Sequence, residues 1–190
     1  MSAGKSRLTL AWSRNRAHSP STIRSIRLSH LRKLRGCEQV AAVCYRVRGG
    51  CIEFLLVQTR GGRWTFPKGS AEPGLTHAQA AALEAFEEAG VHGRMEEASF
   101  ARYRRQSGKR RSVMELIVSA HLCEVTRLEP PQESNRNRTW FIAEKAKQRL
   151  REDRASDYGT ALARVVDRAV ARIQHMKNRA VADPLTIRYK

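Results

Sequence analysis

Three glutamates on one short segment carry the clearest chemistry in the sequence. Glu84, Glu87 and Glu88 stand three and four residues apart. On a helix these spacings share one face, so the carboxylates would crowd together and repel one another. Magnesium is a natural partner, because it takes oxygen ligands and bridges carboxylates to substrate phosphates. Taken alone, the pattern is weak evidence for a metal site, since most such patterns are solvated helix faces paired with Lys or Arg.

The segment around these glutamates has clear helix boundaries. Thr76 is a typical N-cap, because its hydroxyl can accept a hydrogen bond from a free N–H of the first turn. The alanine-rich stretch Ala78–Ala89 has high helix propensity, and Gly90 after it is a common stop. The sequence therefore predicts a helix over Ala78–Ala89 that presents all three carboxylates.

Strands and further helices must position this helix. Glycines 49 and 50 between two apolar runs predict a β-hairpin, and residues 60–69 read as two loops around a short extended piece. After residue 152, apolar residues recur every three or four positions, which predicts a helix face packed on a sheet. The predicted strands are Val40–Val47, Ile52–Gln58, Ala98–Arg105, Val113–Val125 and Trp140–Ile142, and the predicted helices are Ala143–Arg151 and the longer one containing Leu162, Val165, Val166, Ala169, Val170 and Ile173.

Length and charge bound the class of protein. A chain of 190 residues is long enough for one domain. Its formal net charge of +18, from 36 Lys plus Arg against 18 Asp plus Glu, favours a polyanionic partner. Nucleic acid, an anionic membrane surface and a phosphate-rich small molecule all fit, as does a generally basic proteome. No apolar run approaches the ~20 residues of a membrane-spanning helix, and the oligomeric state stays open.

The N-terminal segment of the chain is strongly basic. Residues 1–36 hold nine Lys or Arg and no acidic residue, which is typical of a disordered basic tail, a wrongly chosen start or a mitochondrial transit peptide. Within them, residues 21–34 have loosely helical spacing of apolar residues.

No cysteine pair has metal or redox spacing. Cys44 and Cys51 are predicted to be small buried hydrophobes in a reducing compartment, so the expected location is cytoplasmic.

The pattern around the glutamates resembles the Nudix box. The residues in register are Gly69, Glu84, Ala85, Glu87, Glu88, Gly90 and Val91. The motif from Trp64 to Gly69 and the turn Glu72–Gly74 are similar to the subgroup that cleaves diphosphoinositol polyphosphates and diadenosine polyphosphates. The resemblance covers about residues 38–150. It implies an α/β (α+β) fold, an α/β/α sandwich around a mixed sheet, with a basic extension at 1–36, a Nudix domain at 37–152 and a C-terminal helix and tail at 153–190.

Two positions depart from the family pattern. Leu75 replaces the first box Glu, and Leu83 replaces the Arg that precedes the catalytic Glu. In the family this Arg helps to orient the acidic cluster, so its loss puts rate and metal affinity in question. Glu72, three residues before Leu75, is a candidate replacement for the missing acid.

The resemblance also implies a mechanism. Glu84, Glu87 and Glu88 would be catalytic and would hold Mg²⁺, or Mn²⁺, with the Gly69 carbonyl as a further ligand. The ion would neutralise the diphosphate and acidify a water molecule. Glu84, Glu115 and Glu133 are the candidate general bases. Guanidinium and ammonium groups suit phosphate, and the candidate substrate-binding residues are Arg60, Arg63, Lys68, Lys109, Arg110, Arg111, Arg136 and Arg138.

Two functions follow from these observations. The first is a Mg²⁺-dependent pyrophosphohydrolase that cuts a phosphoanhydride bond in a nucleoside or inositol polyphosphate. The second is a catalytically weakened Nudix domain that binds RNA or polyphosphate without turnover, which Leu75, Leu83 and the basic tail motivate. The tail could also tether the domain to nucleic acid or an anionic surface.

Overall fold

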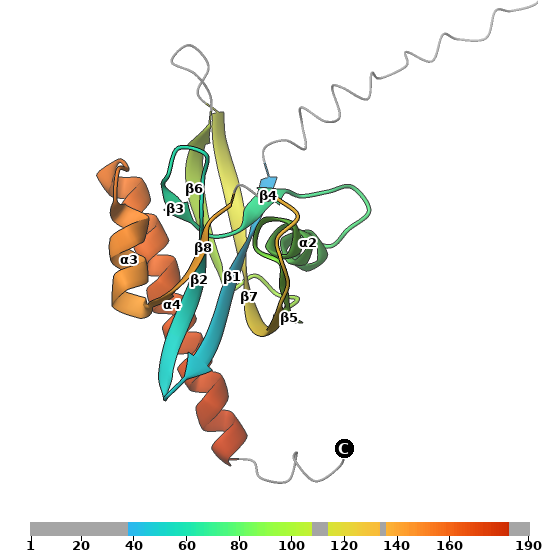
Figure 1. The fold of residues 1–190 in the computed structure, drawn as a ribbon, viewed down its shortest axis with the longest axis vertical. Helices are drawn as coiled ribbons and strands as arrows, with labels where there is room; N and C mark the ends of the chain where they lie inside the picture. Colours follow the sequence, from blue (N-terminus) through green and yellow to red (C-terminus); the bar gives the residue numbers. More distant parts are fainter. Residues whose placement is uncertain (1–37, 108–113, 134–135, 183–190) are drawn as a thin grey trace, which may run out of the picture.

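A mixed β-sheet lies between two layers of helices in the computed structural model, which describes residues 38–107, 114–133 and 136–182 (Figure 1). Helix α2 (His77–Ala89) covers one face of the sheet. Helices α3 (Ala143–Arg151) and α4 (Ser156–Ala182) cover the other. The expected α/β/α sandwich is confirmed. No helix in the described ranges is both long and apolar enough to cross a membrane.

Strand β1 (Glu38–Arg48) organises the sheet. It pairs with β2 (Cys51–Gln58) as an antiparallel hairpin, and both turn glycines, Gly49 and Gly50, have positive φ angles of 55° and 79°. An Asn or Gly is favoured at such positions, because other side chains crowd the backbone there. Strand β1 also pairs in parallel with β7 (Met114–Leu128) and antiparallel with the short β4 (Lys68–Ser70).

The remaining strands extend the two sides of the sheet. Strand β3 (Trp64–Thr65) and strand β8 (Arg138–Ile142) pair with β2, whereas β5 (Val91–Met95) and β6 (Ala101–Ser107) pair with successive parts of β7. The sequence did not predict β5, which is short and has a register shift at Gly93, where a Cβ would lie 2.4 Å from the Glu124 carbonyl oxygen. The prediction that the next strand starts at Ala98 was wrong, since β6 starts at Ala101 after a turn.

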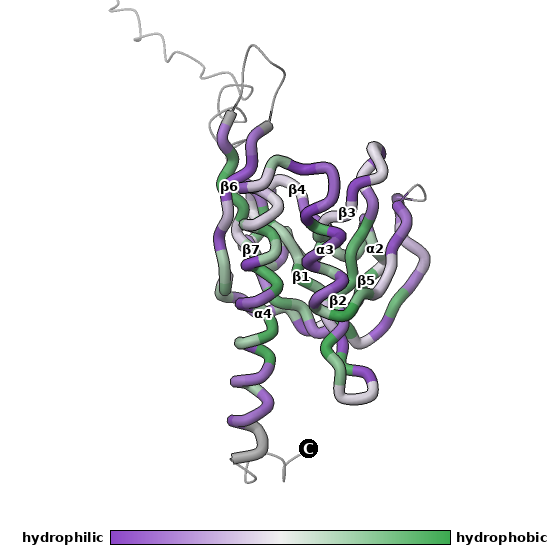
Figure 2. The backbone as a smooth tube through the Cα atoms, turned by 90° about the vertical axis from the view of Figure 1, so that its left-hand side faces the viewer, coloured by the Kyte–Doolittle hydropathy of each residue, from purple (hydrophilic) through white to green (hydrophobic). Residues whose placement is uncertain are grey.

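Two separate cores hold the layers together. The larger core joins the sheet to α3 and α4, and Leu162, Val166 and Ile173 of the predicted apolar stripe are at most 1% exposed. Figure 2 shows hydrophobic and hydrophilic residues alternating along α4, whose C-terminal part extends past the sheet. The smaller core, under α2, is built from alanines packed on valines and cysteines of the sheet.

The predictions for the two cysteines have different outcomes. Cys44 is buried as expected and faces Cys123 across the parallel pair β1–β7. The prediction for Cys51 was wrong: this residue is exposed, because it follows the hairpin turn directly at the start of β2. The predictions for residues 1–36, including a helix over 21–34, lie outside the described residues.

Candidate active site

Helix α2 is held in place from both ends. Its N-terminus forms the capping box of Thr76 and Gln79, in which each side chain accepts a hydrogen bond from the other residue's backbone N–H. Its C-terminus ends at Gly90, which has a φ of 61°. A Cβ there would lie 2.0 Å from the Glu129 carbonyl oxygen, so only glycine fits this stop. The expected helix and both of its boundaries are therefore confirmed to within one residue.

Glu84 lies directly against the backbone of Gly69. A Cβ added to Gly69 would be only 1.6 Å from Oε1 of Glu84, so the glycine makes room for this carboxylate. The pKa of Glu84 is raised to about 7, chiefly by burial and then by the negative charges of Glu88, Glu87 and Glu133, against the opposing charge of Lys68. The three box glutamates thus form one repulsive cluster beside β4, as their spacing predicts.

Glu88 is the most deeply buried of the three carboxylates. Its side chain is 4% exposed and accepts a hydrogen bond from the Lys68 backbone N–H at 3.2 Å. Arg136, from the loop between β7 and β8, places Nη2 2.5 Å from Oε1 of Glu88. Burial raises the pKa of Glu88, while the charges of Lys68 and Arg136 oppose that rise.

Lys68 of β4, whose backbone N–H contacts Glu88, has three arginines around it. The pKa of Lys68 is lowered to about 8, chiefly by burial and also by the charges of Arg105, Arg136 and Arg154, while the charge of Glu88 opposes the fall. Arg154 is anchored through hydrogen bonds to the carbonyl oxygens of Leu150 and Trp64. Lys68 and Arg136 are among the cations predicted from the sequence to bind substrate. The sequence did not single out Arg105 or Arg154, because neither stands in a box motif and only the tertiary fold brings them to Lys68.

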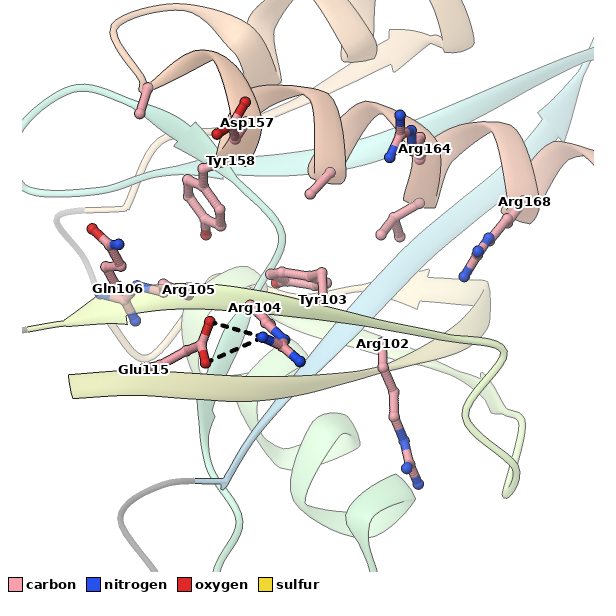
Figure 3. Close-up of a pocket in the computed structure, with 13 residues that line it drawn as sticks. Arg102, Tyr103, Arg104, Arg105, Gln106, Glu115, Asp157, Tyr158, Arg164 and Arg168 are labelled. Carbon is pink, nitrogen blue, oxygen red and sulfur yellow. Dashed lines mark hydrogen bonds and ion pairs between the residues drawn. The ribbon is translucent and has the colours of Figure 1, made fainter.

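A pocket of about 580 Å³ opens beside these cations, between β6 and α4 (Figure 3). Tyr158 of α4 points toward Tyr103 of β6, with ring centroids 6.2 Å apart. The Tyr103 hydroxyl is buried and has no hydrogen-bond partner among the described residues. Arg105 belongs both to the lining of the pocket and to the cations near Lys68, so one end of the pocket lies toward Lys68. Arg164 and Arg168 line its far end.

The other predicted cations have different surroundings. Arg63 donates to the Asp153 carbonyl oxygen at 3.4 Å, and Arg60 is exposed in the loop before β3. Arg138 donates to the carbonyl oxygens of Ala89 and Glu129 at the end of α2, so its guanidinium is engaged in fastening that helix. Its predicted contact with substrate stays a prediction. Lys109, Arg110 and Arg111 lie outside the described residues.

The fold places the candidate acids outside the box in different surroundings. Glu133 contributes to the raised pKa of Glu84 and pairs with Nε of Arg136 at 2.7 Å. Glu115 instead pairs with Arg104 across the β6–β7 hairpin at 3.4 Å. Glu72 is exposed in the turn before α2. Its role as a replacement for the missing box acid stays a prediction.

The donor set suits a cation that needs few protein ligands. Across residues 38–107, 114–133 and 136–182, no three His, Cys, Asp or Glu side chains are close enough to enclose a metal ion by themselves. Magnesium is usually held by one or two carboxylates, with water and substrate phosphates completing its shell. Glu84 and Glu87, whose mutual repulsion a cation would relieve, and the open backbone at Gly69 fit that requirement.

Comparisons with known proteins agree with this architecture. The sequence profile of the NUDIX domain matches residues 38–163, whereas a search of curated proteins returned no match. Among solved structures, an Ap4A hydrolase of C. elegans has a TM-score of 0.54 at 24% identity, covering 72% of this chain and 98% of that one. The NUDIX domain of Shewanella oneidensis NrtR, complexed with ADP ribose, has a TM-score of 0.54 at 16% identity, covering 72% and 87%. A NUDIX hydrolase from Nitrosomonas europaea has a TM-score of 0.52 at 19% identity, covering 65% and 84%.

At these identities the structural likenesses establish the fold, and the profile match over most of the chain establishes the family. The chain belongs to the NUDIX domain family, and it is placed with the phosphohydrolases of that family, which act on acid anhydrides.

Proposed function

We propose that this protein is a Mg²⁺-dependent hydrolase of a phosphoanhydride bond in a nucleoside or inositol polyphosphate. The observation that carries the proposal is the meeting of two opposite charge clusters at β4. Glu84, Glu87 and Glu88 stand on α2, and Lys68 of β4 has three arginines near it, of which Arg136 contacts Glu88 directly. A diphosphate needs both, because cations bind its oxygens while carboxylates hold the divalent ion that accompanies it.

The surroundings of each residue indicate its role in the proposed reaction. Glu84, Glu87, Glu88 and the Gly69 carbonyl would hold Mg²⁺ or Mn²⁺. A bound ion would neutralise charge on the diphosphate and acidify water. Among the candidate bases we favour Glu84, because its raised pKa suits proton transfer near neutral pH and it has no cation partner of its own in the described structure. Glu115 and Glu133 are each paired with an arginine.

The pocket between β6 and α4 is the proposed place for the part of the substrate beyond the cleaved bond. Its two tyrosines, Tyr103 and Tyr158, offer ring surface for a base or sugar, and the Tyr103 hydroxyl lacks a partner among the described residues. Arg164 and Arg168 offer guanidinium groups for further phosphates. A compact substrate dense in phosphate, such as a diadenosine or diphosphoinositol polyphosphate, matches this lining.

The test is a substrate panel with and without Mg²⁺. Diadenosine polyphosphates, triphosphorylated or capped RNA and diphosphoinositol phosphates would be incubated with the full chain, and products would be separated by ion-exchange chromatography. We expect Mg²⁺-dependent cleavage of at least one class. The variant Glu84→Gln should reduce kcat by about 100-fold or more. Glu124→Gln, which removes an exposed surface carboxylate paired with Arg94, is the matched control and should leave kcat unchanged.

The second candidate function is binding of RNA or polyphosphate without turnover. Leu75 and Leu83 favour it, because two charged box positions are apolar. Saturable binding of a panel member with no product in Mg²⁺ or Mn²⁺ would decide for this candidate. Deleting residues 1–36 would test the proposed tether: if the tail binds polyanions, affinity should fall and depend less steeply on salt. We expect a cytoplasmic location, or a mitochondrial one if the tail is a transit peptide.

A further inference from the structure

Helix α2 lacks any positive charge of its own. Its sequence from His77 to Ala89 contains no Lys or Arg, and the three glutamates stand in its C-terminal half. A helix C-terminus carries the negative end of the macrodipole, so carboxylates there are disfavoured. With Leu83 at the position where the Nudix box has Arg, a compensating cation must come from another element.

Arg136 is that cation. Its Nη2 lies 2.5 Å from Oε1 of Glu88, and its Nε lies 2.7 Å from Oε2 of Glu133. The arginine side chain is 17% exposed and the Glu88 side chain 4%. The other oxygen of Glu88 accepts the Lys68 N–H at 3.2 Å. Glu88 is therefore held at both oxygens, and each oxygen keeps a second lone pair for a ligand.

The loop that carries Arg136 is fastened to the same helix. The backbone N–H of Glu133 donates to the Glu87 carbonyl oxygen at 3.0 Å, and the Arg136 N–H donates to the Glu133 carbonyl oxygen at 3.1 Å. On the other side, Asn137 exchanges hydrogen bonds with Gln58, at 2.9 Å for both the backbone and the side-chain contact. The guanidinium thus approaches Glu88 from a residue whose neighbours are hydrogen-bonded to both α2 and β2.

We propose that Arg136 is a positioning residue that fixes the Glu88 carboxylate for divalent-ion binding, doing from the β7–β8 loop what Leu83 cannot do from the helix. The inference rests on the proposed function, because it assigns Glu88 to the ion. An unsupported glutamate must lose side-chain freedom when it binds an ion. Partners that orient a metal ligand typically matter by about 10- to 100-fold in metal affinity or activity.

The sign of the change in ion affinity separates this role from simple charge repulsion. Mn²⁺ binding to the full chain would be titrated by electron paramagnetic resonance without substrate. Removing a positive charge near carboxylates should by itself tighten cation binding. Positioning predicts the opposite: Arg136→Met should weaken Mn²⁺ binding about tenfold. Unchanged or tighter binding by the folded variant would overturn the inference.

A matched control and a conservative variant complete the titration. Arg94→Met removes a similar pair, 2.7 Å from Glu124 but 76% exposed, and should leave Mn²⁺ binding as it is. If Arg136→Met does not fold, Arg136→Lys carries the test, since it keeps the charge but not the planar fork. Weaker Mn²⁺ binding by Arg136→Lys supports positioning, and binding equal to wild type refutes it.

A second-site change tests the link to Leu83. An arginine at position 83 stands four residues before Glu87 and can reach that carboxylate. Leu83→Arg added to Arg136→Met should recover most of the lost Mn²⁺ affinity and kcat. No recovery in a folded double variant would overturn the inference that Arg136 takes the role of the arginine missing at position 83. If wild type binds Mn²⁺ but cleaves no substrate, the proposed function fails while the positioning role can still be measured.

Discussion

The two faces of the sheet are packed on different principles. On the α2 face, Ala81, Ala85 and Ala89 form the helix surface, so helix and sheet approach closely. On the α4 face, large aliphatic side chains such as Leu162 and Ile173 fill the space between helix and sheet. The difference teaches where each property resides: the α4 face supplies most of the buried apolar volume, and the α2 face brings carboxylates to the backbone of β4.

The largest expected effect comes from a variant that disrupts the packing of the α4 face alone. Leu162→Ala leaves a cavity in the main core and should lower the free energy of unfolding by about 2–5 kcal/mol. Denaturant unfolding would measure the loss, with the exposed Gln174→Ala on the same helix as control. Because Leu162 lies neither among the carboxylates nor in the lining of the pocket between β6 and α4, kcat at a temperature where the variant is folded should stay unchanged, and a parallel fall in kcat would contradict the division.

The second largest effect is expected from a variant that disrupts the closest contact on the α2 side, between Gly69 and Glu84. Gly69→Ala would place a Cβ where Oε1 of Glu84 lies, 1.6 Å away, so the carboxylate must move. A displacement of this order should reduce kcat about 100-fold while stability changes little. Gly61→Ala, whose added Cβ meets only Thr59 Oγ1 at 3.9 Å, serves as the matched glycine control and should keep wild-type kcat.

A third change sharpens the comparison by overfilling the alanine interface. Ala85 is 1% exposed, and Ala85→Leu should cost about 1–3 kcal/mol of stability, because the close-packed helix must shift. Unlike Leu162→Ala, it should also lower kcat, since the helix that moves carries Glu84 and Glu88. Steady-state kinetics and denaturant unfolding on the same sample would separate the two effects; a loss of stability with normal kcat would argue against close approach as the basis of the site.

The smallest expected effect concerns pH. Since the pKa of Glu84 is raised to about 7 in the folded protein, the folded state binds a proton more tightly than the unfolded chain does. The stabilisation is complete below the unfolded pKa near 4.5 and is lost as pH rises toward 7. After discounting for its half-exposed side chain, we expect about 1 kcal/mol, or about 2–4 °C in Tm, without divalent ions. Glu84→Gln should flatten this slope in thermal melts.

Local signals made the helix and most strands predictable. Thr76 and Gly90 mark the ends of α2 because capping depends on residues adjacent in sequence, and Gly49 with Gly50 marks the hairpin for the same reason. Strand β5 escaped prediction because His92, Gly93 and Arg94 break its apolar pattern. It forms because β7 offers it a pairing edge.

The candidate site was predictable only on its acidic side. The three glutamates belong to one helix, so their spacing alone brings them together. Arg105 and Arg154 come from different elements, β6 and the turn before α4, and only the packed sheet places them beside Lys68. The partner of Glu88 was expected merely as a substrate ligand, because nothing in the spacing of Arg136 indicates a carboxylate 48 positions earlier.

The parallel pairing of β1 with β7 sets the order in which a growing chain can assemble. The ribosome releases β1 and the carboxylate helix well before β7, Arg136 and Arg154. Until those segments emerge, the acidic helix has β1 and β2 to pack against but lacks the counter-charges of Arg136 and Arg154, and β1 lacks β7, since such long-range pairing forms late. We expect nascent chains that stop short of α4 to be inert, so that phosphoanhydride cleavage begins only once translation of the domain is essentially complete.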